Sequence, residues 1–232
     1  MPNAIYNLWK VLCDFLLPRC CPGCGQELLP YEIPCCLACQ AALPFTHFET
    51  FANNPVFQRM EELVPTVYAT ALFYLHDGGI IQQLIHQLKF NGQQHLGPWL
   101  GNLLAKQLKN SPYAHCTAIV PLPLHPQKKR KRGYNQNHKL CEQLAQVLQI
   151  PLCTNAVFRT KNTAQLSLNK TQDRFAEMEA AFAINPELSI EAPHWLLVDD
   201  VLTTGATLQS CGQALLKYPK AKLSIVVLSY RM

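Results

Sequence analysis

The chain has 232 residues, and apolar residues make up 49% of them, so a mainly disordered protein is excluded because the chain can bury a sizeable core. Lys and Arg number 20 and Asp and Glu 15, but five of the basic residues form one run from Lys128 to Arg132. The formal net charge of +5 therefore belongs to this one segment, which indicates a localised anionic partner rather than a generally basic surface.

The N-terminal residues predict an amphipathic helix and a cytoplasmic protein. No stretch approaches the roughly 18 consecutive apolar residues of a membrane-spanning helix. A signal peptide would need a continuous apolar region, which Asn7, Lys10 and Asp14 interrupt. The apolar residues recur instead at helical spacing, at Ile5, Leu8, Trp9, Leu12, Phe15 and Leu16.

The cysteines predict a structural zinc site. Cys21 and Cys24 form one C-x-x-C knuckle, and Cys36 and Cys39 form a second, so two turns can together offer four thiolates to one ion. A closed four-sulfur shell leaves no position for a reacting water, so we do not expect the metal to be catalytic. The alternative interpretation is a pair of reducible disulfides or simple buried thiols.

Two further cysteines leave the ligand set open. Cys20 and Cys35 each stand immediately before a knuckle, and either could replace its neighbour after a small shift of register. We expect residues 1–50 to form a module of the helix and the zinc site, and residues 51–232 to form a second domain.

Strands alternate with helices through the second domain. Residues 45–64 have weak periodicity and predict a linker with a short helix. Strands are expected at 67–75, 117–121, 195–198 and 223–230, and helices at 80–88, 96–108, 140–148 and 207–216. A polar stretch from 159 to 173 leads into a helical or extended piece that ends at 182. The alternation predicts an α/β fold with a parallel sheet.

The segment from 196 to 207 predicts a phosphate-binding loop. An apolar strand runs into Asp199 and Asp200, whose carboxylates can accept hydrogen bonds from the two vicinal hydroxyls of a ribose. The next residues open a helix, and their backbone N–H groups can hold a phosphate, with Gly205 allowing a close approach. These loop residues are Thr203, Thr204, Gly205, Ala206 and Thr207. The alternative is an ordinary turn in which Asp and Thr only cap the helix.

This segment resembles the ribose-phosphate signature of type I phosphoribosyltransferases, and nearly the whole chain resembles the ComF family. Besides the two knuckles, the resemblance rests on Leu88-Lys89-Phe90, Val120-Pro121-Leu122-Pro123, Arg132-Gly133-Tyr134-Asn135-Gln136, Arg159 with Thr163, Gln165-Leu166-Ser167, Arg174 and Ala181-Phe182. The chain departs from the family at Glu177, where Asn is usual.

The resemblance implies a type I phosphoribosyltransferase-like fold, in which helices flank a twisted, mostly parallel sheet behind a small zinc module. It implies a site for 5-phosphoribosyl 1-diphosphate with Mg²⁺, in which Asp199, Asp200 and Arg132 take part in any catalysis. It also implies a role in DNA uptake during natural transformation, with partners in the DNA-uptake machinery.

The basic run has two functional interpretations. Its charges can screen a departing diphosphate, with a glycine hinge for loop closure. They can equally neutralise single-stranded DNA, with a base stacked on Tyr134. The residues are Lys128, Lys129, Arg130, Lys131, Arg132 and Tyr134. A solvated charged turn is the third alternative.

Two functions follow from these interpretations. In the first, the chain is a DNA-uptake protein that keeps a phosphoribosyl diphosphate pocket and binds single strands. In the second, it is an active phosphoribosyltransferase of nucleotide metabolism, for which the sequence names no acceptor.

Overall fold

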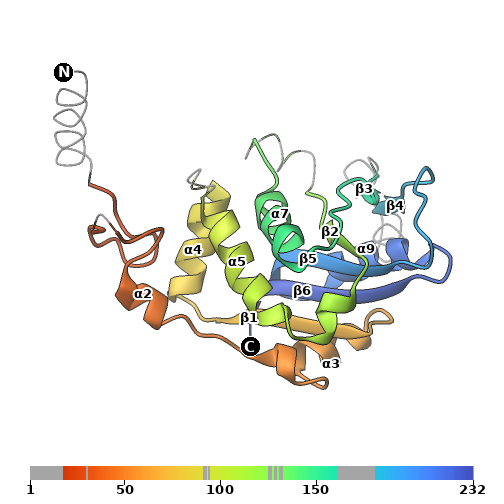
Figure 1. Cartoon of the computed structure of the whole chain (residues 1–232), viewed down its shortest axis with the longest axis horizontal. Coiled ribbons are helices and arrows are strands. Elements are labelled where there is room, and N and C mark those ends of the chain that lie inside the picture. Colours follow the sequence, from red (N-terminus) through yellow and green to blue (C-terminus); the bar gives the residue numbers. More distant parts are fainter. Residues whose placement is uncertain are drawn as a thin grey trace, which may run out of the picture.

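The structure is a computed structural model, and a four-stranded parallel sheet lies at its centre (Figure 1). It describes residues 18–29, 31–90, 93, 95–124, 127, 130, 133–160 and 181–231. The strands follow the order β1 (Tyr68–Leu75), β6 (Lys222–Arg231), β5 (His194–Leu202) and β2 (Ala118–Pro121). The predicted α/β class with a parallel sheet is therefore confirmed.

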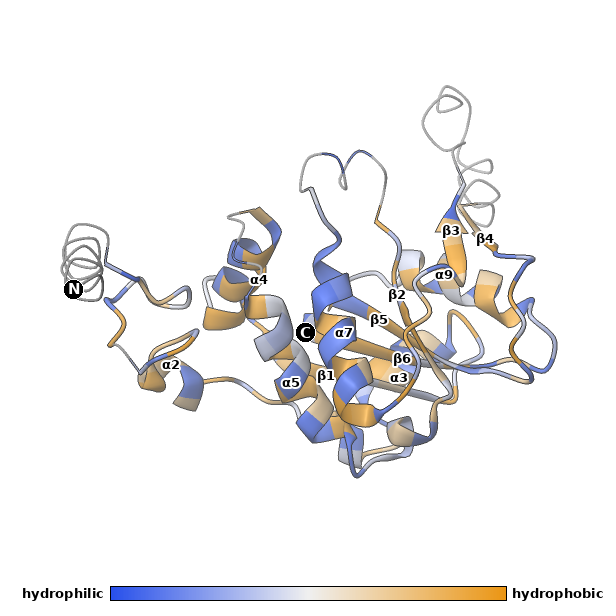
Figure 2. Ribbon diagram, turned by 45° about the horizontal axis from the view of Figure 1, so that its top comes forward, coloured by the Kyte–Doolittle hydropathy of each residue, from blue (hydrophilic) through white to orange (hydrophobic). Residues whose placement is uncertain are grey.

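Helices cover both faces of this sheet because its strands are apolar on both sides. In β5, Leu196 and Val198 pack with α4 (Ile80–Phe90), α5 (Leu96–Leu108) and α7 (Gln136–Leu148). Trp195 and Leu197 point to the other face, which α3 (Pro55–Glu61) and α9 (Ala206–Leu216) cover. Figure 2 shows the hydrophobic colouring along β5 and β6 that this burial on two sides requires.

A close contact between α5 and α7 fixes the first helical layer. A Cβ atom on Gly101 would lie 2.5 Å from the carbonyl oxygen of Leu140 in α7. Only glycine therefore lets the two backbones approach this closely, and α7 is held over β2 and β5 with its first turn at their carboxyl ends.

The predicted linker is in fact the cover of an edge strand. The backbone N–H of Thr46 donates to Leu72 at 3.0 Å, and that of Tyr74 donates to Pro44 at 2.9 Å. A short 3₁₀ helix, Phe48–Thr50, follows. The Asn54 side chain then caps α3 and donates to the carbonyl of Ala69 at 2.8 Å. The weak periodicity of residues 45–64 therefore does not mark an unattached linker, because the start of this segment is hydrogen-bonded to the edge strand β1.

Two other elements differ from the sequence expectation. The polar stretch predicted from 159 begins at the end of β3 (Val157–Arg159), and the helical or extended piece predicted up to 182 ends at β4 (Phe182–Ile184). These two strands form a short antiparallel hairpin, while residues 161–180 between them lie outside the described part. Strand β5 continues past Val198 to Leu202, because Val201 and Leu202 stay paired with β6. The remaining short helices are α2 (Leu37–Ala41) and a 3₁₀ turn at Pro112–His115.

The N-terminal helix predicted over residues 5–16 lies outside the described residues. Among those that are described, no helix combines the length and apolar character needed to cross a bilayer.

Candidate functional site

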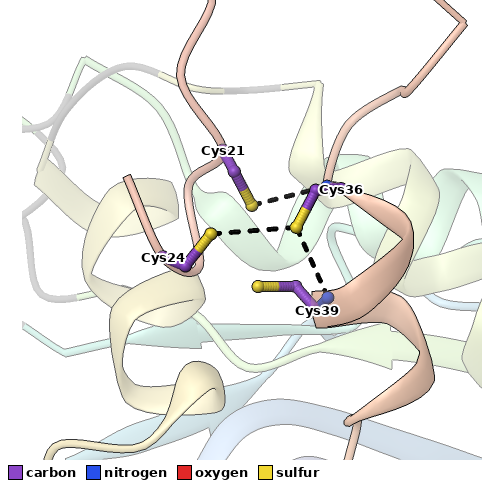
Figure 3. Close-up of side chains that lie close together, drawn as sticks. All are labelled: Cys21, Cys24, Cys36 and Cys39. Atoms are coloured by element: carbon purple, nitrogen blue, oxygen red, sulfur yellow. Dashed lines mark hydrogen bonds between the residues drawn. The ribbon is translucent and has the colours of Figure 1, made fainter. Parts of the chain in front are cut away.

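The structure brings four cysteine sulfurs together at the N-terminal end of the chain. Cys21 and Cys24 come from one turn and Cys36 and Cys39 from the start of α2, and Figure 3 shows their side chains pointing toward one another. All four Sγ atoms lie within 4.8 Å of one another. This is the spacing of a tetrahedral metal site, and a metal such as zinc could bind there.

Backbone N–H groups favour thiolates in this cluster. The N–H of Cys36 donates to the Sγ of Cys21, and that of Cys39 donates to the Sγ of Cys36, each at 3.4 Å. Burial acts to raise the pKa of Cys21, but hydrogen bonds from the backbone, chiefly from Cys36, outweigh it together and lower the pKa to about 6. A sulfur that is already charged near neutral pH is prepared for a cation.

The four-sulfur cluster does not include the two neighbouring cysteines, although the thiol of Cys35 interacts with that of Cys21. Cys20 is exposed, and its thiol lies 3.6 Å from the carbonyl of Pro18. Cys35 is 1% exposed, and burial raises its pKa to about 12.

A buried glutamate, which sequence reasoning missed, shapes the loop between the knuckles. The carboxylate of Glu32 accepts hydrogen bonds from the backbone N–H groups of Leu29 and Leu37, both at 2.8 Å. These hydrogen bonds lower the pKa of Glu32. Glu32 thereby ties the loop to the start of α2, where the second knuckle begins.

Asp200 is held by two side chains from the covering helices. Lys89 of α4 donates to Oδ1 at 2.8 Å, and Gln136 of α7 donates to Oδ2 at 2.7 Å. Asp200 is only 6% exposed, so the ion pair with Lys89 compensates for the burial of its charge. The structure thus adds Lys89 and Gln136 to the two predicted carboxylates.

Asp199 is the more exposed of the pair. The side-chain amide of Asn137 donates to its Oδ1 at 2.9 Å. Burial of the carboxyl group, and then the neighbouring charge of Asp200, raise the Asp199 pKa to about 7. Asp199 can therefore gain or lose a proton near neutral pH. The sequence did not reveal Asn137 because its helical pattern starts at 140, whereas α7 already begins at Gln136.

The predicted phosphate loop forms the other wall of this site. Thr203, Thr204 and Thr207 are exposed, and α9 begins directly after Gly205, whose φ of 83° is left-handed. A small pocket is lined by Asp199 together with residues 201–208. The first backbone N–H groups of α9 have no carbonyl partner within the helix, and that of Ala206 donates a long hydrogen bond of 3.4 Å to the hydroxyl of Thr204, so this turn can offer donors to an anion in the pocket.

A basic side chain from α3 also contacts this loop. The guanidinium of Arg59 in α3 donates to the carbonyl of Thr204 at 3.1 Å. Its other terminal nitrogen lies 3.6 Å from the Glu62 carboxylate. No local sequence signal could reveal this contact, because 145 residues separate the two partners.

The segment 120–123 reaches the same edge of the sheet. Leu122 donates from its backbone N–H to Val198 at 2.9 Å, and its carbonyl accepts from the side chain of Asn135 at 3.3 Å. The hydroxyl of Tyr134 donates to the carbonyl of Leu88 at the end of α4. These contacts place the residues that flank the basic run beside Asp199 and Asp200.

Most of the basic run itself is outside the description. Arg130 is exposed, whereas Lys128, Lys129, Lys131 and Arg132 lie outside the described residues, as do Thr163, Gln165, Arg174 and Glu177.

Comparison with known proteins identifies relatives along most of the chain. No family model matches it. It is 28% identical to DNA utilization protein YhgH of Escherichia coli (strain K12) over 88% of this chain and 81% of that protein. It is 29% identical to competence protein ComFC of Bacillus subtilis over 87% of this chain and 73% of that protein. Competence protein F of Haemophilus influenzae is 34% identical over 58% of this chain and 61% of that protein.

Among solved structures, the comparison finds phosphoribosyltransferases at low TM-scores. Adenine phosphoribosyltransferase from Leishmania tarentolae has a TM-score of 0.37 and 11% identity over 76% of this chain and 88% of that chain. A hypoxanthine phosphoribosyltransferase from Staphylococcus aureus has a TM-score of 0.31 and 18% identity over 59% and 62%. The predicted resemblance to the ComF family is confirmed to this extent: most of the chain is similar in sequence to YhgH and ComFC, and more than half of it to competence protein F.

Proposed function

We propose that this chain binds 5-phosphoribosyl 1-diphosphate at the carboxyl end of β5 and takes part in DNA uptake during natural transformation. The observation that carries the proposal is that Asp199 and Arg59 both lie at the loop that starts α9, while the adjacent Asp200 holds the ammonium of Lys89. A phosphorylated sugar needs three kinds of partner. A carboxylate accepts from its hydroxyls, and cations and the backbone N–H groups of a helix start bind its phosphates.

Each part of the ligand has a partner in this arrangement. The 5′-phosphate lies against residues 203–207, with Arg59 beside Thr204. Asp199 accepts from a ribose hydroxyl. Asp200 acts mainly through Lys89, because its carboxylate lies 2.8 Å from the ammonium nitrogen and holds it beside the site. The ammonium in turn stabilises the diphosphate.

Mg²⁺ fits the same site by its ligand chemistry. Hard cations take oxygen ligands, and Asp199 offers carboxylate oxygens. Beside it, Asn137 is 1% exposed, and its Oδ1 has no hydrogen-bond partner among the described residues. When bound, the ion neutralises charge that develops on a diphosphate.

The DNA role rests on the relatives, whose names refer to competence and to DNA utilization. We place single-stranded DNA on residues 128–132 and Tyr134, because a basic segment neutralises a phosphate backbone. Tyr134 is partly exposed, and its hydroxyl is already bonded to Leu88. The ring is thus held in one orientation while part of its surface remains accessible to a base.

We assign one structural zinc to Cys21, Cys24, Cys36 and Cys39, within a module that ends near residue 50. The protein would act in the cytoplasm, where thiols stay reduced. None of the described cysteines forms a disulfide.

Phosphoribosyl transfer is a second candidate function. It is favoured by the pKa of Asp199, raised to about 7, because a carboxylate that titrates near neutral pH can accept a proton from an acceptor. No acceptor pocket is assigned. Release of pyrophosphate from labelled 5-phosphoribosyl 1-diphosphate in the presence of candidate acceptors tests this function separately.

Paired binding measurements test the main proposal. Asp199→Ala with Asp200→Ala should abolish binding of 5-phosphoribosyl 1-diphosphate and leave zinc content unchanged. Replacing all five basic residues at 128–132 by Gln should remove strand binding, which in the wild type falls steeply with salt. Full ligand affinity in the first variant would refute the ribose assignment, and unchanged strand affinity in the second would refute the DNA site.

A further inference from the structure

A second cavity lies at the opposite edge of the sheet from the phosphate loop. It has a volume of about 410 Å³ and is lined mainly by Glu49, Phe51, Tyr68, Gln107, Asn110 and Tyr113. This volume falls within the range of small-molecule sites. Tyr68 begins β1, whereas Asp199 lies in the carboxyl-terminal half of β5. Because the strands are parallel, the cavity lies at the amino ends of the strands and the proposed phosphoribosyl site at their carboxyl ends.

The cavity holds a buried carboxylate with little compensation. The side chain of Glu49 is 7% exposed, and its ion-pair partner among the described residues is His47, at 3.7 Å, which is 61% exposed itself. A buried charge is costly unless it is paired. No Lys or Arg is among the residues that line the cavity, so the carboxylate has room for a cation from outside.

Aromatic rings complete the walls. Tyr68 and Tyr113 pack with their ring centroids 5.6 Å apart, and Phe51 is 61% exposed at the rim. Burial above all, together with the charges of Cys116 and Glu49, raises the pKa of Tyr113 well above its ordinary value. The phenol therefore stays neutral and does not compete with Glu49 for a cation.

We propose that this cavity binds the cationic nitrogen group of an organic ligand, a guanidinium or alkylammonium with an apolar chain. Glu49 pairs with the charge, the aromatic rings contact the cation and its chain, and the amides of Gln107 and Asn110 accept its remaining N–H groups. Nucleic acid does not fit, because a carboxylate in a cavity without basic residues repels phosphate.

Titrations of the full chain with two cations and one neutral analogue test the proposal. N-acetyl-arginine amide represents a side chain of a partner protein, agmatine represents a free amine, and N-acetyl-citrulline amide has nearly the same shape without the charge. We expect at least one cation to bind about tenfold or more tightly than the citrulline compound. A preference for the arginine compound would indicate a protein partner, and a preference for agmatine would indicate a small molecule.

Three variants decide whether the binding occurs in this cavity. Glu49→Gln keeps the shape and should weaken cation binding about tenfold or more. Phe51→Ala changes an exposed ring, so the fold should persist while binding weakens several-fold. Glu187→Gln removes an exposed carboxylate elsewhere and should change nothing. Equal binding of the citrulline compound, no binding of either cation at about 10 mM, or unchanged binding in both Glu49→Gln and Phe51→Ala would overturn the proposal.

Discussion

At the scale of single residues, Asp199 and Asp200 differ although they are adjacent. Successive side chains of a strand point to opposite faces. Asp200 points between α4 and α7, where Lys89 and Gln136 occupy its two oxygens. Asp199 remains partly exposed beside the loop that starts α9. The two carboxylates therefore differ in what they can do: Asp200 holds Lys89, and Asp199 is the one placed to contact the proposed ligand.

Asp199 should make stability depend on pH. Folding raises its pKa to about 7 from about 4 in an unfolded chain. Between these values the folded state binds more protons than the unfolded state, so the free energy of unfolding falls as pH rises through this window. Asp199→Asn should remove that fall and stabilise the protein at pH 8 by on the order of 1 kcal/mol. Urea unfolding at pH 5 and pH 8 measures this.

The control for this prediction is Glu187→Gln, which replaces an exposed carboxylate and should keep the wild-type pH dependence. If Asp199→Asn retained that dependence too, the assignment of the raised pKa to Asp199 would be wrong.

Arg59 should determine affinity for the phosphate group. It is partly exposed and bonded to the carbonyl of Thr204, so its charge lies at the mouth of the proposed site. Arg59→Gln should weaken binding of ribose 5-phosphate by about 10- to 100-fold, since one charge-assisted hydrogen bond contributes about 1.5–3 kcal/mol. Calorimetric titration gives the affinity. Lys222→Gln removes the same charge at the start of β6, on the far edge of the sheet, and should have little effect. An equal loss in both variants would indicate a general charge effect.

At the scale of elements, the turn into α9 depends on a glycine in close contact with α3. A Cβ atom on Gly205 would lie 2.6 Å from Leu63 and 3.3 Å from Met60. Gly205→Ala should therefore destabilise the protein by about 2–4 kcal/mol, from backbone strain and overpacking together. Thermal and urea unfolding measure the loss.

Gly78→Ala separates these two causes. Gly78 has a φ of 72°, and a Cβ there would have nothing within 4 Å, so only strain of about 1–2 kcal/mol is expected. Losses of the same size in both variants would show that contact with α3 does not constrain the loop.

The cysteine cluster should make the N-terminal module depend on metal. Cys39→Ser should lower the zinc content from one ion per chain to none and expose the segment 18–43 to proteolysis, because a bound metal would tie the two knuckles together. Native mass spectrometry and limited proteolysis report the two effects. Cys153→Ser changes a cysteine outside the cluster and should leave both unchanged. A wild-type protein purified without metal would contradict the zinc assignment.

The sequence was a good guide to elements with a strong local pattern and a poor guide to contacts between distant segments. The predicted strand at 67–75 and helix at 96–108 nearly coincide with β1 and α5, because each has clear periodicity. Residues 45–64 predict a linker because they lack a clear local repeat, whereas in the structure the start of this segment pairs with the edge strand β1. The contact of Arg59 with Thr204 depends entirely on the tertiary fold, so no spacing in the sequence could predict it.

At the scale of the whole molecule, the chain joins three chemically distinct regions. The cysteine cluster packs into the same hydrophobic core as α4 and α5, the predicted phosphate loop lies at the carboxyl end of β5, and the Glu49 cavity lies at the opposite end of the strands. The positive charge that the composition reveals belongs to the segment between β2 and α7. With the two proposed sites at opposite ends of the strands, an anionic and a cationic ligand would bind without direct competition.

The central claim is that residues 203–207 hold the 5′-phosphate of 5-phosphoribosyl 1-diphosphate. Phosphorus NMR tests it most directly, because the 5′-phosphate and the diphosphate give separate signals. On titration of the ligand and Mg²⁺ with the full chain, the 5′-phosphate signal should shift or broaden, and ribose 5-phosphate should reverse the change by competition. Asp199→Ala with Asp200→Ala should abolish this response. An unchanged 5′-phosphate signal at saturating protein would contradict the account.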